Sequence, residues 1–333
     1  MKRRALVRSV ALSTIGLSLS KQSLSTIKES TGLRDKNKGS FSMDGNKIRF
    51  THPLVSKPFS ITMLADTHLF RDDTRGEMYS PYSKRMAKAY NQTKHYQTGR
   101  DINPEIAFEE TIQLAKDQNS SLLALVGDIF SYPSEAAIDW VLDRLKNTDI
   151  PYVYTAGNHD WHYEGMEGSS EQLRDTWIKK RLLPFYQGRD PYKQKIEMNG
   201  INLVILDNST YEINEEQLRF LKDCMSENKP IVLMVHIPLY APGRNLGFGC
   251  GHPQWNAKND KSYTLERRLP WRETGHTTST LKFYDTVFSS NNILGILTGH
   301  IHNQSIDIIN GIPQIVAEAN AEGGFLHINF LPE

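Results

Sequence analysis

Cysteine is scarce in this chain. Only Cys224 and Cys250 occur in 333 residues, and neither belongs to a C-x-x-C pair. We therefore expect neither a thiolate metal site nor a C-x-x-C redox motif. A disulfide between the two cysteines stays open, because it requires an oxidising compartment and a geometry that the sequence does not give.

Long apolar runs and an excess of charge are also missing. No stretch reaches the roughly 18 apolar residues that a membrane-spanning helix requires, so we expect no transmembrane anchor. Lysine and arginine number 39 against 38 aspartates and glutamates, which gives a net charge of +1. A charge so close to balance offers no argument for a nucleic-acid polymer or an anionic membrane as the partner.

What the chain does contain is five short polar motifs rich in aspartate, histidine and asparagine. Four directly follow a short apolar run typical of a buried strand, and the Asn158 motif follows the mixed run 152–156. Ligands bind beyond the carboxyl ends of strands in open α/β sheets, so we expect the five motifs to meet at one site. In chain order the motifs are Asp66-Thr67-His68, Gly127-Asp128, Gly157-Asn158-His159-Asp160, Val235-His236 and Gly299-His300-Ile301-His302.

The side chains of these motifs predict a site for two metal ions. Carboxylate, amide and imidazole groups suit Mn²⁺, Fe or Zn²⁺. Seven such groups are too many for one catalytic ion that keeps an open position, but they suit two ions that share a carboxylate. Two ions roughly 3.5–4 Å apart can clamp the attacking and leaving oxygens of a displacement at phosphorus. The seven residues are Asp66, His68, Asp128, Asn158, His236, His300 and His302.

The ordered pattern D-x-H, G-D, G-N-H-D, V-H and G-H-x-H resembles that of the calcineurin-like metallophosphoesterase superfamily. The motifs extend from Asp66 to His302, which is most of the chain. Each motif is weak alone, since an aspartate after a strand is usually a turn residue or a helix cap. All five in this order, each behind a strand-like run, form a specific signal.

The resemblance implies how the seven ligands would be shared between two divalent ions. Asp128 would bridge the ions, and a bridging water with its pKa lowered to roughly 7 would attack phosphorus in line. The first ion would be held by Asp66, His68 and His302, and the second by Asn158, His236 and His300.

Two further residues gain roles from the same resemblance. His159 would protonate the leaving oxygen or stabilise the phosphoryl charge, because an imidazole with an unperturbed pKa of about 6.5 suits that task. Asp160 would orient His159 or the loop that carries it.

The first motif separates branches of the superfamily. His68 stands where the purple acid phosphatases have a glycine, and Tyr132 lies four residues after Asp128, not three. We therefore do not expect the tyrosinate-bound iron subgroup, and the chain resembles the D-x-H branch of phosphodiesterases, nucleotidases and protein phosphatases. No arginine of the kind that protein phosphatases carry lies close to Asp128 or Asn158. A small-molecule substrate is therefore expected.

The expected activity is hydrolysis of a phosphoric ester, with a phosphodiester slightly preferred. The alternative is a phosphomonoesterase or nucleotidase that acts on a small molecule. Two other classes stay open, namely a metal-binding scaffold without catalysis and metal-assisted hydrolysis of an amide or carboxyl ester. The filled ligand positions and the presence of His159 argue against the scaffold.

The first 25 residues resemble an export signal. Basic residues at Lys2, Arg3 and Arg4 precede a small, apolar stretch, and the adjacent arginines fit a twin-arginine signal. The stretch is Ser-rich and lacks a clear A-x-A site, so a basic tail on a cytoplasmic protein is the alternative. We expect an export signal over residues 1–25, a linker over 26–45, one catalytic domain over 46–333, and a periplasmic or extracellular location.

Strand-like and helix-like segments alternate through this domain, which predicts an α/β fold. The resemblance implies two mixed β-sheets packed as a sandwich and flanked by helices. Asn214 and Gln217 form a capping-box pattern at the start of one predicted helix. Besides the five runs, strands are expected over 47–52 and 58–65, a β-meander over 305–309, 314–316 and 325–330 with a turn at Asn310-Gly311, and helices over 104–118, 135–145, 171–182 and 214–225.

Two insertions interrupt the pattern, over about 71–100 and 240–280. The first is polar and Tyr-rich, and it could form a wall of the pocket or a solvated excursion. The second is longer than an ordinary loop and starts close to His236. Arg244 or His252 could contact a substrate phosphate, and His162 could line the pocket, although each could equally be an ordinary loop residue.

Overall fold

The computed structural model of the protein describes residues 39–89, 94–242, 244 and 276–333. The predicted export signal, Cys250 and His252 lie outside these residues. Cys224 lies on the buried face of the helix Glu215–Ser226, and burial raises the pKa of its thiol to about 11. Because Cys250 lies outside the described residues, the pairing of Cys224 with Cys250 stays open.

The first of two six-stranded sheets carries the Asp66, Asp128 and Asn158 motifs. Its strands are β1 Ser40–Asp44, β2 Lys47–Thr51, β3 Phe59–Leu64, β4 Leu122–Val126, β5 Tyr152–Thr155 and β12 Leu326–Leu331. Their order is β1-β2-β12-β3-β4-β5, with β3, β4 and β5 parallel. β3 and β4 are buried along their whole length, which agrees with the unbroken apolar sequence of β4 and the largely apolar sequence of β3.

The second sheet carries the His236 and His300 motifs. Its strands are β6 Lys193–Met198, β7 Ile201–Leu206, β8 Ile231–Met234, β9 Ile293–Thr298, β10 Ser305–Ile309 and β11 Ile312–Val316. Their order is β10-β11-β9-β8-β7-β6. β7, β8 and β9 run parallel, so their carboxyl ends lie at the same edge of the sheet.

The helices begin with side-chain caps where the sequence offers them. Asn214 and Gln217 form the predicted capping box, with Gln217 N donating to Asn214 Oδ1 at 2.8 Å and Asn214 N donating to Gln217 Oε1 at 3.0 Å. The helices are α1 Ser80–Ser83, α2 Met86–Ala89, α3 Pro104–Asp117, α4 Glu135–Lys146, α5 Ser170–Trp177, α6 Leu183–Tyr186, α7 Glu215–Ser226 and α9 Thr278–Phe288.

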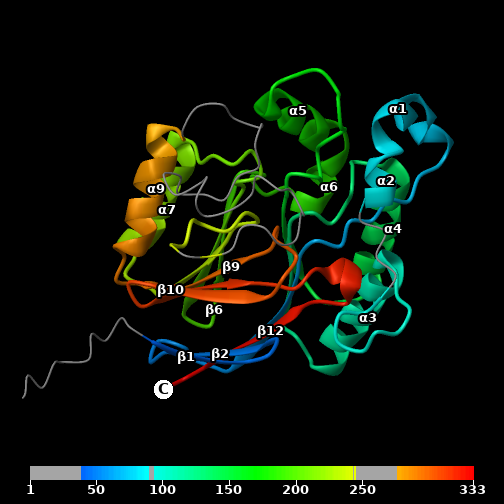
Figure 1. The fold of residues 1–333 in the computed structure, drawn as a ribbon. Coiled ribbons are helices and arrows are strands. Elements are labelled where there is room, and N and C mark those ends of the chain that lie inside the picture. Colours follow the sequence, from blue (N-terminus) through cyan, green and yellow to red (C-terminus); the bar gives the residue numbers. More distant parts are fainter. Residues whose placement is uncertain (1–38, 90–93, 243, 245–275) are drawn as a thin grey trace, which may run out of the picture. The chain divides into compact units, whose positions relative to one another are not determined.

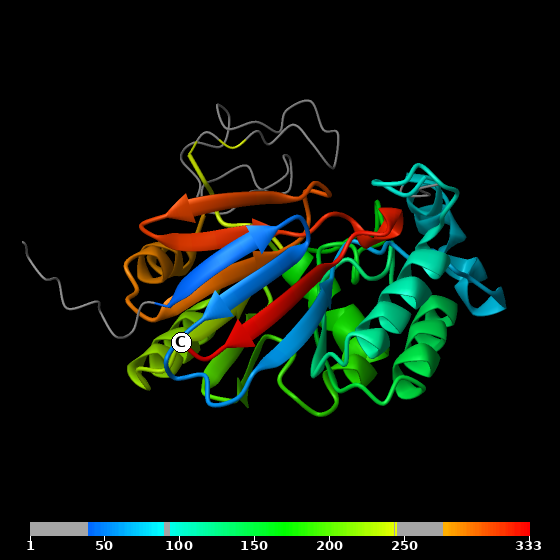
Figure 2. The same cartoon turned by 90° about the horizontal axis from the view of Figure 1, so that it is seen from below.

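Sheets and helices form four layers within residues 39–333. The two sheets pack face to face through a core that includes Phe50 and Ile61 of the first and Leu203 and Met234 of the second. Figures 1 and 2 show α3 and α4 on the outer side of one sheet and α7 and α9 on the outer side of the other. The predicted α/β sandwich of two mixed sheets flanked by helices is confirmed.

Several sequence-based expectations need correction. The last predicted strand, β12, does not continue a meander after β11, because it joins the first sheet between β2 and β3. β1 forms within the predicted linker 26–45 and pairs with β2. The predicted helix 171–182 ends as α5 at Trp177 and continues as a π-helical turn, Ile178–Leu182, into α6. β6, β7 and α9 were not predicted.

The turn at Asn310-Gly311 is confirmed. It joins the antiparallel strands β10 and β11, and both residues have positive φ angles, of 51° and 82°. Asparagine and glycine are the residues that tolerate such angles in a two-residue hairpin. Among the described residues, no helix has the length and apolar character needed to cross a membrane.

The described part of the first insertion packs against the body of the domain. The ring of Tyr79 stacks on Tyr163, with centroids 5.1 Å apart, and the Arg181 guanidinium lies 4.9 Å from the Tyr79 centroid. Tyr163 follows the Asn158 motif directly. This part of the segment is therefore not a purely solvated excursion, and a role as a pocket wall stays a prediction.

Glu212, in the segment after β7, holds the start of α9 in place through hydrogen bonds. Its carboxylate accepts hydrogen bonds from Thr277 N at 3.1 Å, Thr277 Oγ1 at 3.0 Å and Thr280 Oγ1 at 2.5 Å. His276 Nδ1 lies 2.9 Å from the same carboxylate. Burial alone would raise the pKa of Glu212, but the bonds from His276 and Thr280 lower it to about 2.

The substitution Glu212→Gln should therefore have a pH-dependent cost. A carboxyl whose pKa falls from 4.5 to about 2 on folding contributes stability that is complete above pH 5 and is lost as the pH falls toward 2. We expect a loss of about 3 kcal/mol at pH 7, reduced to less than half at pH 3. Urea unfolding of both proteins at pH 7, 5, 4 and 3 measures the difference, and a loss of equal size at every pH would contradict this account.

Candidate metal centre

The five motifs lie where the carboxyl ends of the parallel strands of both sheets meet. Asp66 N donates to Gly127 O at 3.0 Å and His68 N donates to Asp128 O at 2.9 Å, which joins the first two motifs. In the second sheet, Gly299 N donates to His236 O at 2.9 Å. These backbone hydrogen bonds bring the motif loops together, as the sequence predicted.

Five of the proposed ligands stand in a left-handed backbone conformation. Their φ angles are 58° at Asp66, 51° at His68, 52° at Asp128, 74° at His300 and 59° at His302. Such angles are uncommon for residues other than glycine and cost on the order of 1–3 kcal/mol each. They persist here because hydrogen bonds between the motif loops fix each turn.

Two motif positions require glycine because a neighbouring ligand side chain lies directly against the backbone there. Gly127 has a φ of 82°, and a Cβ at this position would overlap the ring of His236. A Cβ at Gly157 would overlap the Asp128 carboxylate. A glycine before the aspartate or asparagine therefore lets the neighbouring ligand approach the backbone.

Both buried aspartates divide their two oxygens between the backbone and the centre. Asp66 Oδ2 accepts a hydrogen bond from His300 N at 2.8 Å, and Asp128 Oδ1 accepts one from His159 N at 2.7 Å. The second oxygens point inward. Asp66 Oδ1 lies 3.4 Å from His302 Nε2, and Asp128 Oδ2 lies 3.2 Å from His236 Nε2.

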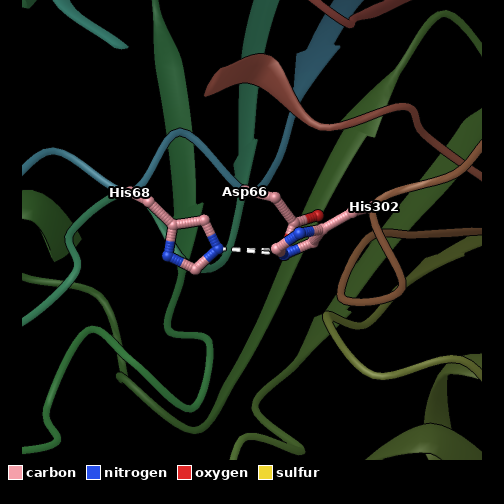
Figure 3. Close-up of side chains that lie close together, drawn as sticks. All are labelled: Asp66, His68 and His302. Atoms are coloured by element: carbon pink, nitrogen blue, oxygen red, sulfur yellow. Dashed lines mark hydrogen bonds and ion pairs between the residues drawn. The ribbon is translucent and has the colours of Figure 1, made fainter. Parts of the chain in front are cut away.

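His68 and His302 form one side of the centre. Their Nε2 atoms lie 3.0 Å apart, and Figure 3 shows the two rings pointing toward one another beside Asp66. Burial and the nearby His302 lower the pKa of His68 well below 6.5. Burial alone would lower the pKa of His302 too, but the Asp66 carboxylate raises it.

His236 and His300 form the other side. His236 Nδ1 donates to Val126 O at 2.9 Å, which directs its Nε2 atom toward Asp128. This is the usual arrangement of a metal-binding histidine, whose second nitrogen is held by a carbonyl. Burial alone would lower the pKa of His236, but Asp128 raises it to about 9, whereas burial and His236 lower the pKa of His300 well below 6.5.

These donors fit divalent cations. Within the described residues, three buried donor atoms of the centre have no hydrogen-bond partner, namely Asp66 Oδ1, Asn158 Oδ1 and His236 Nε2. An unsatisfied buried polar atom costs about 1–3 kcal/mol, so atoms gathered in this way call for a ligand. Asp66, His68 and His302 form one group of donor atoms within 4.8 Å of one another, and Asp128, His236 and His300 form another.

A sequence profile described as calcineurin-like phosphoesterase matches residues 59–304, which contain every motif of the centre. The chain belongs to this phosphoesterase family. A 57-residue segment is also 40% identical to a "Probable cyclic nucleotide phosphodiesterase" of Moraxella catarrhalis (strain BBH18). That match covers 17% of this chain and 21% of the relative, so the chain matches only about a fifth of the relative's length.

The chain is also similar to solved structures. A dimetal phosphatase from Danio rerio is 13% identical, with a TM-score of 0.50 over 81% of this chain and 91% of that chain. A purple acid phosphatase from yellow lupin (Lupinus luteus) seeds is 12% identical, with a TM-score of 0.45 over 83% of this chain and 46% of that chain. The first likeness agrees with the four-layer fold described above.

Asp160 organises two loops of the phosphoesterase centre. Its carboxylate accepts hydrogen bonds from Asp128 N at 2.9 Å, Phe130 N at 2.8 Å and Gly157 N at 2.8 Å. Burial and the charge of Asp128 raise the pKa of Asp160 to about 7, while the N–H donors favour its charged form. Asp160 therefore joins the backbone of the Asp128 loop to the backbone of its own loop, which carries Asn158.

His159 lies at the partly exposed side of the centre. Its ring meets the His68 ring edge-on at 4.9 Å, and its Nδ1 atom lies 3.3 Å from Ser131 O. The ring of His162 lies 6.4 Å from that of His159, and its role in lining a pocket stays a prediction. Arg244 instead forms a buried ion pair with Asp307 of β10, so a substrate contact from Arg244 would require its guanidinium to leave Asp307.

Some residues that build the centre carry no motif. Asn208 and Ser209, after β7, and Asn320, before β12, contact the loops that carry the proposed ligands. An isolated asparagine or serine gives no signal in one sequence. A prediction of β7 would have helped, because Asn208 follows its carboxyl end in the way that the motif residues follow theirs.

Asp160→Asn should weaken metal binding without unfolding the protein. The substitution replaces one carboxylate oxygen by an NH2 group. This group cannot accept the hydrogen bonds that the backbone N–H groups of the two loops donate to the carboxylate. We expect the affinity for Mn²⁺, measured by isothermal titration calorimetry, to fall about 10–100-fold. Asp143→Asn, at an exposed site on α4, is the matched control and should bind Mn²⁺ like the wild type. An unchanged affinity in Asp160→Asn would refute the role.

Proposed function

We propose that this phosphoesterase binds two divalent ions and hydrolyses a small phosphodiester. The observation that supports this most directly is the gathering of six aspartate and histidine side chains into two groups of donor atoms. In addition, Asp66 Oδ1, Asn158 Oδ1 and His236 Nε2 make no hydrogen bond among the described residues. A phosphomonoesterase or nucleotidase is the alternative. A scaffold without catalysis would have no use for His159 beside the ligands.

The ligand set divides into two halves around Asp128. Asp66, His68 and His302 would hold one ion, and Asn158, His236 and His300 would hold the other. Bound Mn²⁺, Fe or Zn²⁺ would polarise the phosphoryl oxygens and lower the pKa of a water to about 7, which makes it a nucleophile at neutral pH. The inward oxygens of both aspartates and the directed nitrogen of His236 prepare the site for this charge.

His159 would assist the leaving oxygen. Its backbone N–H is fixed by Asp128 and its ring lies against His68, so the imidazole stays beside the reacting phosphate. In the protonated form it can give its proton to the alkoxide that departs. A leaving alkoxide is a strong base, and its protonation by a positioned acid is worth about 10²–10⁴-fold in rate.

The carboxyl groups of Glu318 and Glu322 both interact electrostatically with His302, and we propose that this acidic rim favours a diester over a monoester. The turn Asn320–Glu322 contacts the Asp66 loop, where Ala321 N donates to Asp66 O at 3.0 Å. Glu322 ends this turn, and Glu318 accepts a hydrogen bond from Gln304 N at 2.9 Å. Negative charge there repels a dianionic monoester more strongly than a monoanionic diester.

We also place the protein in the D-x-H branch of the family. His68 points into the centre, and the Tyr132 hydroxyl donates to Phe70 O at 2.9 Å, a contact that engages it away from metal coordination. Export, and the division into signal, linker and catalytic domain, are further proposals. They are supported by the basic residues and the apolar stretch at the start of the chain.

His159→Ala should lose turnover but keep its metals. We expect metal-dependent hydrolysis of bis(p-nitrophenyl) phosphate, abolished by EDTA, with kcat lower by about 10²–10⁴-fold in the variant. Mn²⁺ binding by calorimetry should persist. His327→Gln, on β12, is the control and should keep wild-type turnover. A fully active His159→Ala would remove His159 from the mechanism.

Glu318→Gln should change the choice of substrate. Removing one negative charge from the rim should raise kcat/KM for p-nitrophenyl phosphate relative to the diester by about 1.4- to fivefold, as expected for a charge interaction of roughly 0.2–1 kcal/mol. Glu197→Gln, exposed on β6, serves as the control. The same ratio in wild type and Glu318→Gln would show that the rim does not select the substrate.

A further inference from the structure

Asn208 holds the loop of His236 by a pair of hydrogen bonds. Its Nδ2 atom donates to Ile237 O at 2.7 Å, and Ile237 N donates to its Oδ1 atom at 3.0 Å. The side chain is fully buried, and its amide pairs with the backbone as a neighbouring strand would. Ile237 is the residue after His236, so Asn208 acts one residue away from a proposed ligand.

The same short segment also contacts the loop that carries Asn158 and the ring of His300. Trp161 Nε1 donates to Ser209 Oγ at 2.8 Å, and Trp161 belongs to the loop of Asn158. The ring of Tyr211 meets that of His300 edge-on, with centroids 5.7 Å apart. One buried segment therefore supports every ligand proposed for the second ion.

Asn320 supports the opposite half. Thr67 Oγ1, between Asp66 and His68, donates to Asn320 Oδ1 at 2.9 Å. Asn320 Nδ2 donates to Thr111 Oγ1 and Gly324 O, each at 2.9 Å, and Asn320 N donates to Ala65 O at 2.9 Å. This fully buried side chain links the D-x-H turn to α3 and to the segment before β12.

We propose that Asn208 and Asn320 are positioning residues that support the two halves of the centre separately. The inference rests on the proposed binding of two ions. The two asparagines contact different loops, and Asp160 fixes the loop of the shared Asp128. A change at Asn208 should therefore weaken the ion held by Asn158, His236 and His300, and a change at Asn320 should weaken the other.

The halves are joined, which limits their separation. His300 of one half and His302 of the other belong to the same short loop. Asp66 Oδ2 accepts a hydrogen bond from His300 N at 2.8 Å, so some disturbance passes between them. Among the described residues, neither Asn208 nor Asn320 forms a hydrogen bond with the opposite half. Each asparagine substitution should therefore reduce the affinity for the ion of its own half more than the affinity for the ion of the opposite half.

The test uses full-length protein and Co²⁺ as the probe. Visible absorption of bound Co²⁺ reports its coordination, and anomalous scattering from Co²⁺-soaked crystals shows which half is filled. Asn208→Ala should bind one ion about 10–100-fold more weakly and lose the peak between Asn158, His236 and His300. Asn320→Ala should lose the peak beside Asp66, His68 and His302 instead.

Asn202→Ala is the matched control. Asn202 is a fully buried asparagine at the opposite end of β7, and its Nδ2 atom donates to Glu227 Oε2 at 3.0 Å. It should lose stability and keep both Co²⁺ affinities. If circular dichroism shows an alanine variant to be unfolded, Ser209→Ala and Thr67→Val decide, since each removes only a hydroxyl group and should show the same pattern at smaller size.

The outcomes separate this inference from the proposed function. Wild-type protein that binds fewer than two Co²⁺ ions would overturn the proposed function and the inference with it. Wild-type protein that binds two ions, with variants that keep both affinities or lose both ions equally, would overturn the inference alone. Loss of the ion from the half that contacts the substituted residue would support it.

Discussion

The centre depends on how its two buried aspartates divide their oxygens. Asp66 and Asp128 each accept a backbone N–H with one oxygen and direct the other inward. The first bond fixes the carboxylate without a counter-ion, and it joins loops from different strands. The inward oxygen keeps its full capacity for a cation. Because buried charge is costly without a partner, this arrangement is stable only where a cation completes it or neighbouring imidazoles share the charge.

The same constraint explains the unusual backbone of the motifs. The loops must turn sharply after a buried strand to bring a side chain back over the strand end, and the left-handed φ angles at Asp66, Asp128 and His300 make that turn. Such turns are unfavourable alone. The apolar core between the sheets and the apolar contacts outside them stabilise the domain. Their free energy offsets the strain of these turns.

The sequence predicted those parts of the protein whose information is local. β4 and β10 matched their predicted bounds because an unbroken apolar run or an alternating one is a local property. The partner of a strand is not local, which is why β12 was assigned to a meander with β11 although it inserts beside β3. The π-helical turn after Trp177 was missed for a similar reason, since its apolar spacing resembles that of an α-helix.

Single residues of the site also differ in whether a local sequence pattern predicts them. Ligands are restricted to a few residue types and recur in motifs, so their order along the chain was informative. Asn208 and Asn320 act by donating to and accepting from backbone groups, a task that many polar residues perform at many places. Their role becomes visible only when the loops of His236 and Thr67 are seen against them. Residues that bind a cation can therefore be read from a sequence, whereas residues that fix the position of those ligands require the fold.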